Sequence, residues 1–282
     1  MAHKNKLPLI VQIETALKAL LKIGESRDEA KDQKTDHEGI YSWNTFRAYL
    51  KWCCIFANFC LTRHKCKTLK KCRRFADEWL SYLMDHYSPS TCKLAASALA
   101  KLYQCSGKDF IKTPPRKRAD IKRSRGPKVR DKHFSEENHK NLVDFCKSTG
   151  LRRHELSMLR GTDLVYKDGK YYIHVRKGKG GKERLSQIIG NIGNVVDLMH
   201  KAGKNKVFSI ISGGADIHGY RRDYANTFYR ILARPLDTLI EDDLYVCQKD
   251  KAGVVYDRWA MLCVSENLGH NRIDVIAAHY LD

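Results

Sequence analysis

The sequence predicts a mainly α-helical chain with one small antiparallel β-sheet, an α+β fold divided into two domains. Apolar residues recur at helical spacings through the first 110 residues, whereas period-two alternation is confined to a short stretch around Asp168-Gly169. Between these two regions, a basic segment with three prolines interrupts both patterns. The length of 282 residues is enough for two domains, each with its own core.

Residues 1–111 are predicted to form a helical domain. Apolar residues from Leu9 to Leu21 indicate the first helix, and Ser42 offers an N-cap for a second helix, "SWNTFRAYLKWCCIFANFCL". A third helix, "TLKKCRRFADEWLSYLMDHY", would place Tyr82 on its apolar side together with three other apolar residues. Ser88 and the proline after it break the chain and cap a fourth helix, "TCKLAASALAKLYQC".

Residues 112–132, "KTPPRKRADIKRSRGPKVRDK", are predicted to form an extended linker. They contain ten Lys and Arg against two Asp, a net charge of +8. Two roles remain open for this segment: a solvated tether, or a strap that follows a phosphate backbone, which the positive charge of the whole chain favours. The strap would contact DNA through Arg116, Lys117, Arg118, Lys122, Arg123 and Arg125.

Residues 133–282 are predicted to combine helices with the sheet. Ser135 would cap the helix "SEENHKNLVDFCKST". Asp168-Gly169 is a two-residue hairpin turn, and a second reversal at Gly178–Gly181 gives about three antiparallel strands. The next helix is expected in "GADIHGYRRDYANTFYRILA", a further hairpin in "LYVCQKDKAGVVYDRWAM", and the last two elements in "MLCVSENLGH" and "RIDVIAAHYL".

The charge of the chain points to a polyanionic partner. The sequence has 52 Lys+Arg against 32 Asp+Glu, a net charge of +20, which favours nucleic acid or anionic lipid. The chain contains no apolar run of about 18 residues, the length that would indicate a membrane-spanning helix. Its N-terminus lacks the architecture of a signal peptide. We therefore expect a cytoplasmic protein whose partner is nucleic acid and not a membrane.

The ten cysteines leave three alternatives. Cys54, Cys60, Cys66 and Cys72 recur every six residues, so that neighbouring cysteines do not share one face of a helix, and no C-x2-C pair begins a zinc site. Reduced thiols are therefore favoured over zinc ligands and over disulfides. "KGKGGKER" lacks the spacing of a phosphate-binding P-loop, and H-E-x-x-H is absent, so we predict no cofactor and no metal.

A set of cations and one tyrosine remain as candidates for chemistry, in four segments that read "TGLRRHELSMLRGTDL", "KGKGGKERL", "HGYRRDYA" and "NLGHNRIDVIAAHYL". Taken singly, each of these residues is more often structural than functional. In this order, the segments resemble the active-site boxes of the tyrosine recombinases, also called the phage integrase family. The resemblance covers about residues 133–282, and the helical first domain is similar to the core-binding domain of that family. It implies a two-domain clamp around DNA.

The resemblance also implies the roles of individual residues. A tyrosine would cleave DNA as the nucleophile and form a 3′-phosphotyrosine, two arginines would hold the phosphate, and a lysine would protonate the departing 5′ oxygen. His218 would take the tyrosine proton or hold the phosphate, His270 would hydrogen-bond the phosphate, and Glu155 would buttress the site. The matching residues are, as the catalytic set, Arg152, Lys179, His218, Arg221, His270 and Tyr280, and, as the supporting carboxylate, Glu155.

The expected function is therefore that of a site-specific DNA recombinase or integrase of a mobile genetic element. The resemblance implies a nucleoid-associated protein that binds double-stranded DNA as a dimer on each site. Two sites would pair in a tetramer that exchanges strands through a Holliday junction, with accessory DNA-bending proteins as further partners. Two alternatives remain: a type IB topoisomerase-like enzyme that relaxes DNA, and a catalytically silent DNA-binding protein.

The sequence departs from the family pattern at several positions. Arg222 stands where a second histidine is common, and residues 234–260 lengthen the interval before His270. Only two residues follow Tyr280, where many relatives have a further helix that docks on a neighbouring protomer. We therefore expect the contacts between protomers in the insertion 234–260 or in the N-terminal segment 1–40.

Overall fold

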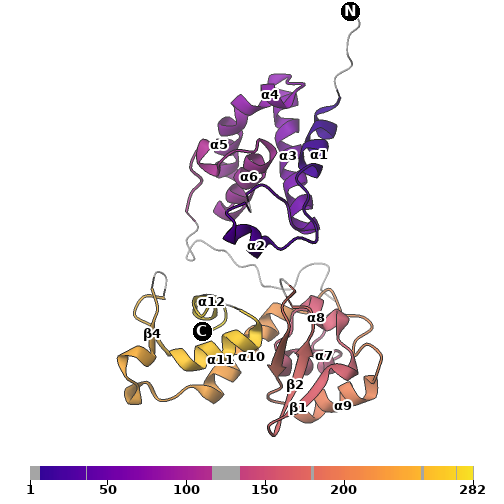
Figure 1. The fold of residues 1–282 in the computed structure, drawn as a ribbon, viewed down its shortest axis with the longest axis vertical. Helices are drawn as coiled ribbons and strands as arrows, with labels where there is room; N and C mark the ends of the chain where they lie inside the picture. The colour runs from indigo at the N-terminus through magenta and orange to yellow at the C-terminus, as the bar shows by residue number, and fades with distance from the viewer. Residues whose placement is uncertain are drawn as a thin grey trace, which may run out of the picture. The chain divides into compact units, whose positions relative to one another are not determined.

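The computed structural model describes residues 7–35, 37–115, 134–178, 181–248, 251–270 and 272–281. The chain forms two compact units, Met1–Ile121 and Lys122–Asp282 (Figure 1). The α+β prediction is confirmed, because the described residues form helices together with two small antiparallel sheets. The predicted domain boundaries stay a prediction. Most of the linker lies outside the described residues, and so do all of its proposed DNA contacts: Arg116, Lys117, Arg118, Lys122, Arg123 and Arg125.

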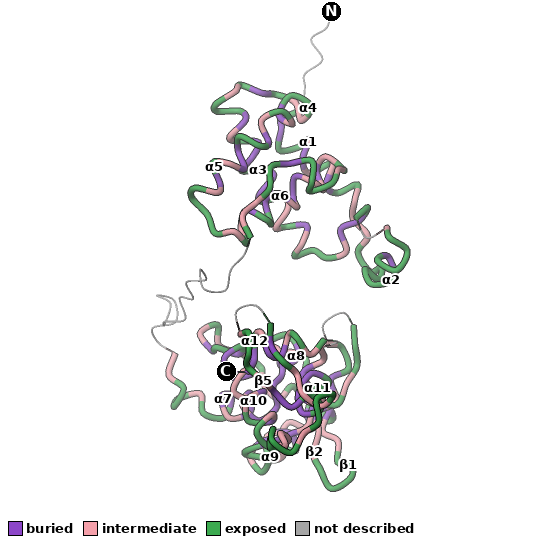
Figure 2. The backbone as a smooth tube through the Cα atoms, turned by 90° about the vertical axis from the view of Figure 1, so that its left-hand side faces the viewer, coloured by how far each residue is buried: buried purple, intermediate pink, exposed green. Residues whose placement is uncertain are grey.

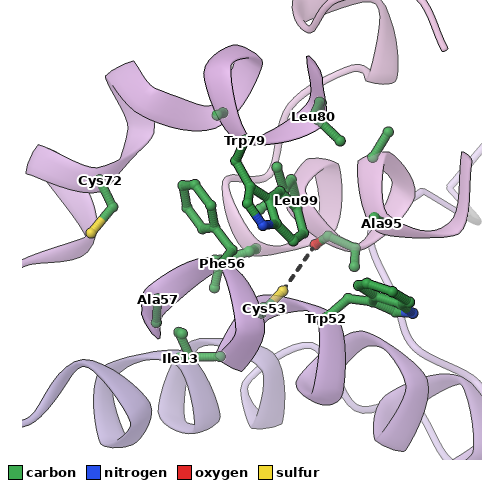
Figure 3. Close-up of a cluster of buried hydrophobic side chains, with 14 of the residues drawn as sticks. Ile13, Trp52, Cys53, Phe56, Ala57, Cys72, Trp79, Leu80, Ala95 and Leu99 are labelled. Atoms are coloured by element: carbon green, nitrogen blue, oxygen red, sulfur yellow. Dashed lines mark hydrogen bonds between the residues drawn. The ribbon is translucent and has the colours of Figure 1, made fainter. Parts of the chain in front are cut away.

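The first unit is a helical bundle. Its α-helices are α1 (Leu9–Lys18), α2 (Arg27–Asp32), α3 (Trp43–His64), α4 (Leu69–Cys72), α5 (Ala76–His86) and α6 (Pro89–Leu102). The long helix α3 packs against α1, α5 and α6. Figure 3 shows where their apolar faces meet, with Phe56, Trp79 and Leu99 side by side in the core and the thiol of Cys53 donating to the carbonyl of Ala98 over 3.5 Å.

Short polar residues begin two of these helices, as predicted. The hydroxyl of Ser42 accepts a hydrogen bond from the backbone N–H of Thr45, and Ser88 does the same for Thr91. The third predicted helix is interrupted, however, because a 3-10 turn separates α4 from α5. The prediction that Tyr82 lies on the apolar side of this helix is wrong: its side chain is 40% exposed and stacks on His86, with the ring of Phe59 tilted against it.

The second unit packs helices around a three-stranded sheet. Its strands are β1 (Leu164–Lys167), β2 (Lys170–Val175) and β3 (Arg184–Gln187), in the order β1-β2-β3, and β4 (Leu244–Val246) and β5 (Val255–Asp257) form a separate hairpin. Its α-helices are α7 (Lys140–Thr149), α8 (Arg153–Met158), α9 (Ile192–Ala202), α10 (Ile217–Leu232), α11 (Arg258–Leu268) and α12 (Asp274–His279). Figure 2 shows buried residues recurring along α10 and α11.

The predicted hairpins of this unit are confirmed, but one helix start is not. Lys167 pairs with Lys170, so that Asp168 and Gly169, both with positive φ, make the two-residue turn of the first hairpin. Ser135 does not cap α7, which begins only at Lys140. Its hydroxyl instead accepts from the N–H of Asn138 and closes a separate turn, because four residues of turn precede the helix.

The ten cysteines are free thiols, and several belong to the apolar core of the first unit. In the described parts of the chain, no group of three or more His, Cys, Asp or Glu side chains is arranged to hold a metal ion. No helix within those same residues has the length and apolar character needed to cross a membrane.

Candidate active site

The candidate site begins where α7 turns into α8. Gly150 ends α7 in the left-handed region at φ +61°, and a Cβ there would lie 2.4 Å from the ring of Tyr224. Only glycine fits both the backbone angle and this close approach. The turn that follows sets Arg152 at the N-cap of α8, with 16% of its side chain exposed. The local sequence therefore presents an arginine at a helix start.

Glu155 anchors this arginine. Its buried carboxylate accepts a 2.8 Å hydrogen bond from the backbone N–H of Arg152 and another of 2.8 Å from Nη1 of the same residue. Arg184 donates to both carboxylate oxygens, over 2.9 Å and 2.8 Å. Burial alone would raise the pKa of Glu155, but the hydrogen bonds and charge of Arg184 and Arg152 lower it to about 2. Glu155 is therefore a carboxylate at neutral pH.

Arg221 is the most buried cation of the site. It lies in α10 with no exposed surface, and its Nη1 and Nη2 donate to the backbone carbonyls of Gly150 and Leu268. Burial first, and then the nearby charge of Arg152, lower the pKa of Arg221 to about 10, while Tyr280 opposes the shift. A pKa of about 10 keeps the guanidinium charged at neutral pH. The fold therefore holds a positive charge inside the second unit.

His270 and Tyr280 meet this charge from the end of the chain. Gly269 ends α11 at φ +65°, His270 follows it, and Tyr280 lies at the C-cap of α12. The hydroxyl of Tyr280 is 3.2 Å from Nε of Arg221 and 3.2 Å from Nε2 of His270. The same Nε2 lies 3.5 Å from Nη2 of Arg152 and 3.5 Å from Nη2 of Arg221. One imidazole nitrogen thus contacts both arginines and the tyrosine.

The structure therefore brings five of the seven predicted site residues into one cluster: Arg152, Glu155, Arg221, His270 and Tyr280. His218 is exposed in the first turn of α10, three residues before Arg221. Lys179 lies outside the described residues. The catalytic roles of all seven remain predictions.

Sequence reasoning missed Arg184, which is the first residue of β3. It lies inside the quoted segment "KGKGGKERL", so the signal was available in the motif itself. In a run so rich in lysine, however, one more cation resembles a solvated side chain. In the structure only 8% of its side chain is exposed.

Residues 234–260 contribute a further buried carboxylate, besides Glu155 and Asp163. Asp257 accepts from Nε and Nη2 of Arg234, each over 2.8 Å, and also caps α11 by accepting from the N–H of Trp259. Hydrogen bonds from Arg234 hold the pKa of Asp257 well below its usual range. This pair fixes the β4–β5 hairpin to the start of the helix that leads to His270.

Comparison with known proteins identifies the fold. No protein-family model matches the chain, and no curated protein matches it either. Among solved structures, the chain is similar to XerH site-specific recombinase bound to palindromic difH substrate in a post-cleavage complex. The TM-score is 0.53 and the sequence identity is 16%, and the alignment covers 99% of this chain and 94% of that chain. The pre-cleavage complex of XerH with difH substrate gives a TM-score of 0.52 and 14% identity, over 98% of this chain and 95% of that one. The chain therefore has the fold of the tyrosine recombinases.

Proposed function

We propose that the protein is a site-specific DNA recombinase or integrase that cleaves and rejoins DNA strands through Tyr280. The observation that carries this proposal is the position of the Tyr280 hydroxyl, 3.2 Å from both Arg221 Nε and His270 Nε2. A core tyrosine needs one hydrogen-bond partner, whereas this one faces a buried cation and an imidazole together. Such surroundings suit a nucleophile that must attack a phosphate.

The two arginines supply the binding charge for that phosphate. Arg152 and Arg221 both direct an Nη2 towards His270, so that their positive charges converge beside the tyrosine hydroxyl. Guanidinium groups bind the non-bridging oxygens of a phosphodiester and stabilise the extra charge of a pentavalent transition state. An incoming phosphate oxygen would replace the Tyr280 hydroxyl as the acceptor of Arg221 Nε. That exchange would leave the hydroxyl beside the phosphorus atom.

The proton of the nucleophile can pass to His270. A tyrosine hydroxyl has an ordinary pKa of about 10, so attack at neutral pH needs a base within hydrogen-bond reach. Nε2 of His270 lies at such a distance, 3.2 Å. The bond from the tyrosine oxygen to phosphorus then forms as the bond from phosphorus to the 5′ oxygen breaks. By its match to the family motif, Lys179 would protonate that oxygen, and His218 would hold the phosphate.

The assembly follows from the same proposal. We infer that the partner is double-stranded DNA. The protein would bind each site as a dimer and form a tetramer when two sites pair. A Holliday junction would form between the two strand exchanges. Accessory DNA-bending proteins would assist the pairing. The basic linker would follow the phosphate backbone, in keeping with a net charge of +20 for the chain. The setting would be a mobile genetic element.

The test uses nicked duplexes of random sequence as suicide substrates. A nick beside the cleaved bond lets the short fragment diffuse away, so that the protein stays covalently attached. We expect an adduct that mass spectrometry maps to Tyr280 and that Tyr280→Phe does not form. Tyr166→Phe is the matched control, because that ring is 65% exposed and lies outside the cluster. Tight DNA binding without any adduct would refute the proposal, and relaxation of plasmid without strand exchange would indicate a topoisomerase instead.

A further inference from the structure

We propose that Arg184 is a positioning residue of the cleavage site, which acts through Glu155 on Arg152; this inference rests on the proposed function. Nη1 and Nη2 of Arg184 donate to the two carboxylate oxygens of Glu155, over 2.9 Å and 2.8 Å. The same carboxylate accepts a 2.8 Å hydrogen bond from Nη1 of Arg152. The two arginines thus share one buried carboxylate. Arg184 fixes this carboxylate from one side, and Arg152, whose Nη2 is directed towards His270, would bind the phosphate from the other.

The charge of Arg184 affects how Arg152 binds the carboxylate that they share. A carboxylate that faced Arg152 alone would offset its charge and attract both of its terminal nitrogens. Because Arg184 occupies one lone pair on each oxygen, Arg152 binds Oε1 through Nη1 only and keeps Nη2 towards His270, 3.5 Å away. Arg184 therefore leaves one donor of Arg152 available for phosphate and restores a net positive charge to the group of three.

Arg184 also connects three segments of the site. Its Nε donates to the carbonyl of Asn267 over 2.8 Å, on the last turn of α11. A Cβ on Gly269 would lie 3.0 Å from Cδ of Arg184, and a Cβ on Gly178 would lie 3.0 Å from its Nη1. The two glycines stand directly before His270 and Lys179 in the sequence. The arginine therefore passes between Gly178 and Gly269.

Direct contact of Arg184 with DNA does not fit this geometry. Each of its three nitrogens already donates to an acceptor of the protein, Nε to Asn267 and Nη1 and Nη2 to Glu155. Only 8% of the side chain is exposed. A largely buried residue that donates from all three of its nitrogens to acceptors of the protein affects the phosphate through the groups it holds. Its loss should therefore slow cleavage while DNA affinity stays close to that of the wild type.

The experiment is a double-mutant cycle in single-turnover cleavage of a suicide substrate at saturating protein. We expect Arg184→Gln to slow adduct formation roughly 100-fold, since a misplacement of a catalytic group by about 1 Å can cost about 100-fold in rate. Arg184→Lys should not rescue, because one ammonium cannot replace the bidentate fork. In the Arg152→Ala background, Arg184→Gln should add less than about threefold, because residues that act as a unit are non-additive.

Two further variants keep the test decisive. Arg230→Gln, at an exposed position of α10, is the control and should cleave as the wild type does. If Arg184→Gln fails to fold, the double variant Glu155→Gln/Arg184→Gln removes both buried charges together, and it should fold yet still cleave slowly. Cleavage at the wild-type rate by that double variant would overturn the inference. So would a full, roughly 100-fold further loss of rate when Arg184→Gln is added to Arg152→Ala. Absence of any adduct from the wild type would overturn the proposed function as well.

Discussion

The cores of the two units differ in what they bury. In the first unit, the buried side chains are apolar, with aromatic rings, leucines, alanines and thiols packed between helices. Every buried polar or charged side chain of the described residues lies in the second unit: Ser148, Thr149, Glu155, Asp163, Ser186, Arg221, Asp257 and Ser265. The first unit is stabilised by apolar packing, whereas the second is stabilised in part by paired buried charges.

This difference separates a unit with an apolar core from the unit that contains the candidate site. A buried charge costs several kcal/mol unless it is paired and hydrogen-bonded, so an unused one would be replaced by an apolar side chain at a gain in stability. Arg221 has no exposed surface, and its guanidinium contacts carbonyl oxygens, a tyrosine and an imidazole, with no carboxylate among the contacts described. A positive charge kept inside the protein in this way is suited to binding an anion.

The largest expected effect tests the apolar core of the first unit. Trp79 is 1% exposed, and its ring lies 5.2 Å from that of Phe56. Trp79→Ala should lower the free energy of unfolding by about 3–5 kcal/mol, because it leaves a large cavity. Trp43→Ala is the control, since Trp43 is 52% exposed and should cost under about 1 kcal/mol. Hydrogen exchange should locate the loss in α3, α5 and α6, and equal losses for both variants would contradict the comparison.

The second prediction changes charge without changing shape. Glu155→Gln keeps the volume of the side chain but removes the carboxylate that Arg152 and Arg184 share. The shift of the pKa of Glu155 from 4.5 to about 2 corresponds to a loss of about 3 kcal/mol at neutral pH. Denaturant unfolding should detect it. Glu137→Gln, at an exposed position, should be neutral, and a Glu155→Gln variant as stable as the wild type would show that the pairing contributes nothing.

The third prediction follows from the sign of that pKa shift. A carboxyl group whose pKa is lower in the folded state stabilises the fold above its unfolded pKa and loses this effect as the pH falls through the folded value. The stability difference between the wild type and Glu155→Gln should therefore be constant above about pH 5 and shrink towards pH 2. Urea midpoints across this range measure it. A difference that persists unchanged at pH 2 would assign the effect to shape instead of charge.

The same contrast explains which features could be predicted from the sequence. The caps at Ser42 and Ser88, the turn at Asp168-Gly169 and the hairpins depend on neighbouring residues, and the structure agrees with all of them. The order of the motifs predicted the fold correctly. The exposure of Tyr82 depends on which helices pack against α5, and no periodicity reveals this.

The cluster itself was predicted only in part. Arg152, Arg221, His270 and Tyr280 were found because their segments resemble a known order of motifs, and in the structure His270 Nε2 lies within 3.5 Å of the other three side chains. Arg184 was missed because a cation in a basic segment gives no sign of burial. Whether an arginine is solvated or paired depends on residues far away in the chain, in this case Glu155, which is 29 positions earlier.

The smallest expected effect concerns a helix start that lies outside both cores. The hydroxyl of Ser88 accepts a hydrogen bond from the backbone N–H of Thr91 over 3.4 Å. It also lies 3.1 Å from the side-chain oxygen of Thr91. Ser88→Ala should lower the free energy of unfolding by about 1 kcal/mol, because a backbone donor at the start of α6 loses its acceptor. Ser88→Asp should retain most of the stability, since a carboxylate caps as well and suits the positive end of the helix dipole. Because the cap at Ser88 lies outside the active-site cluster, neither variant should change the rate of adduct formation on a suicide substrate, and a slower rate would mean that the start of α6 affects cleavage.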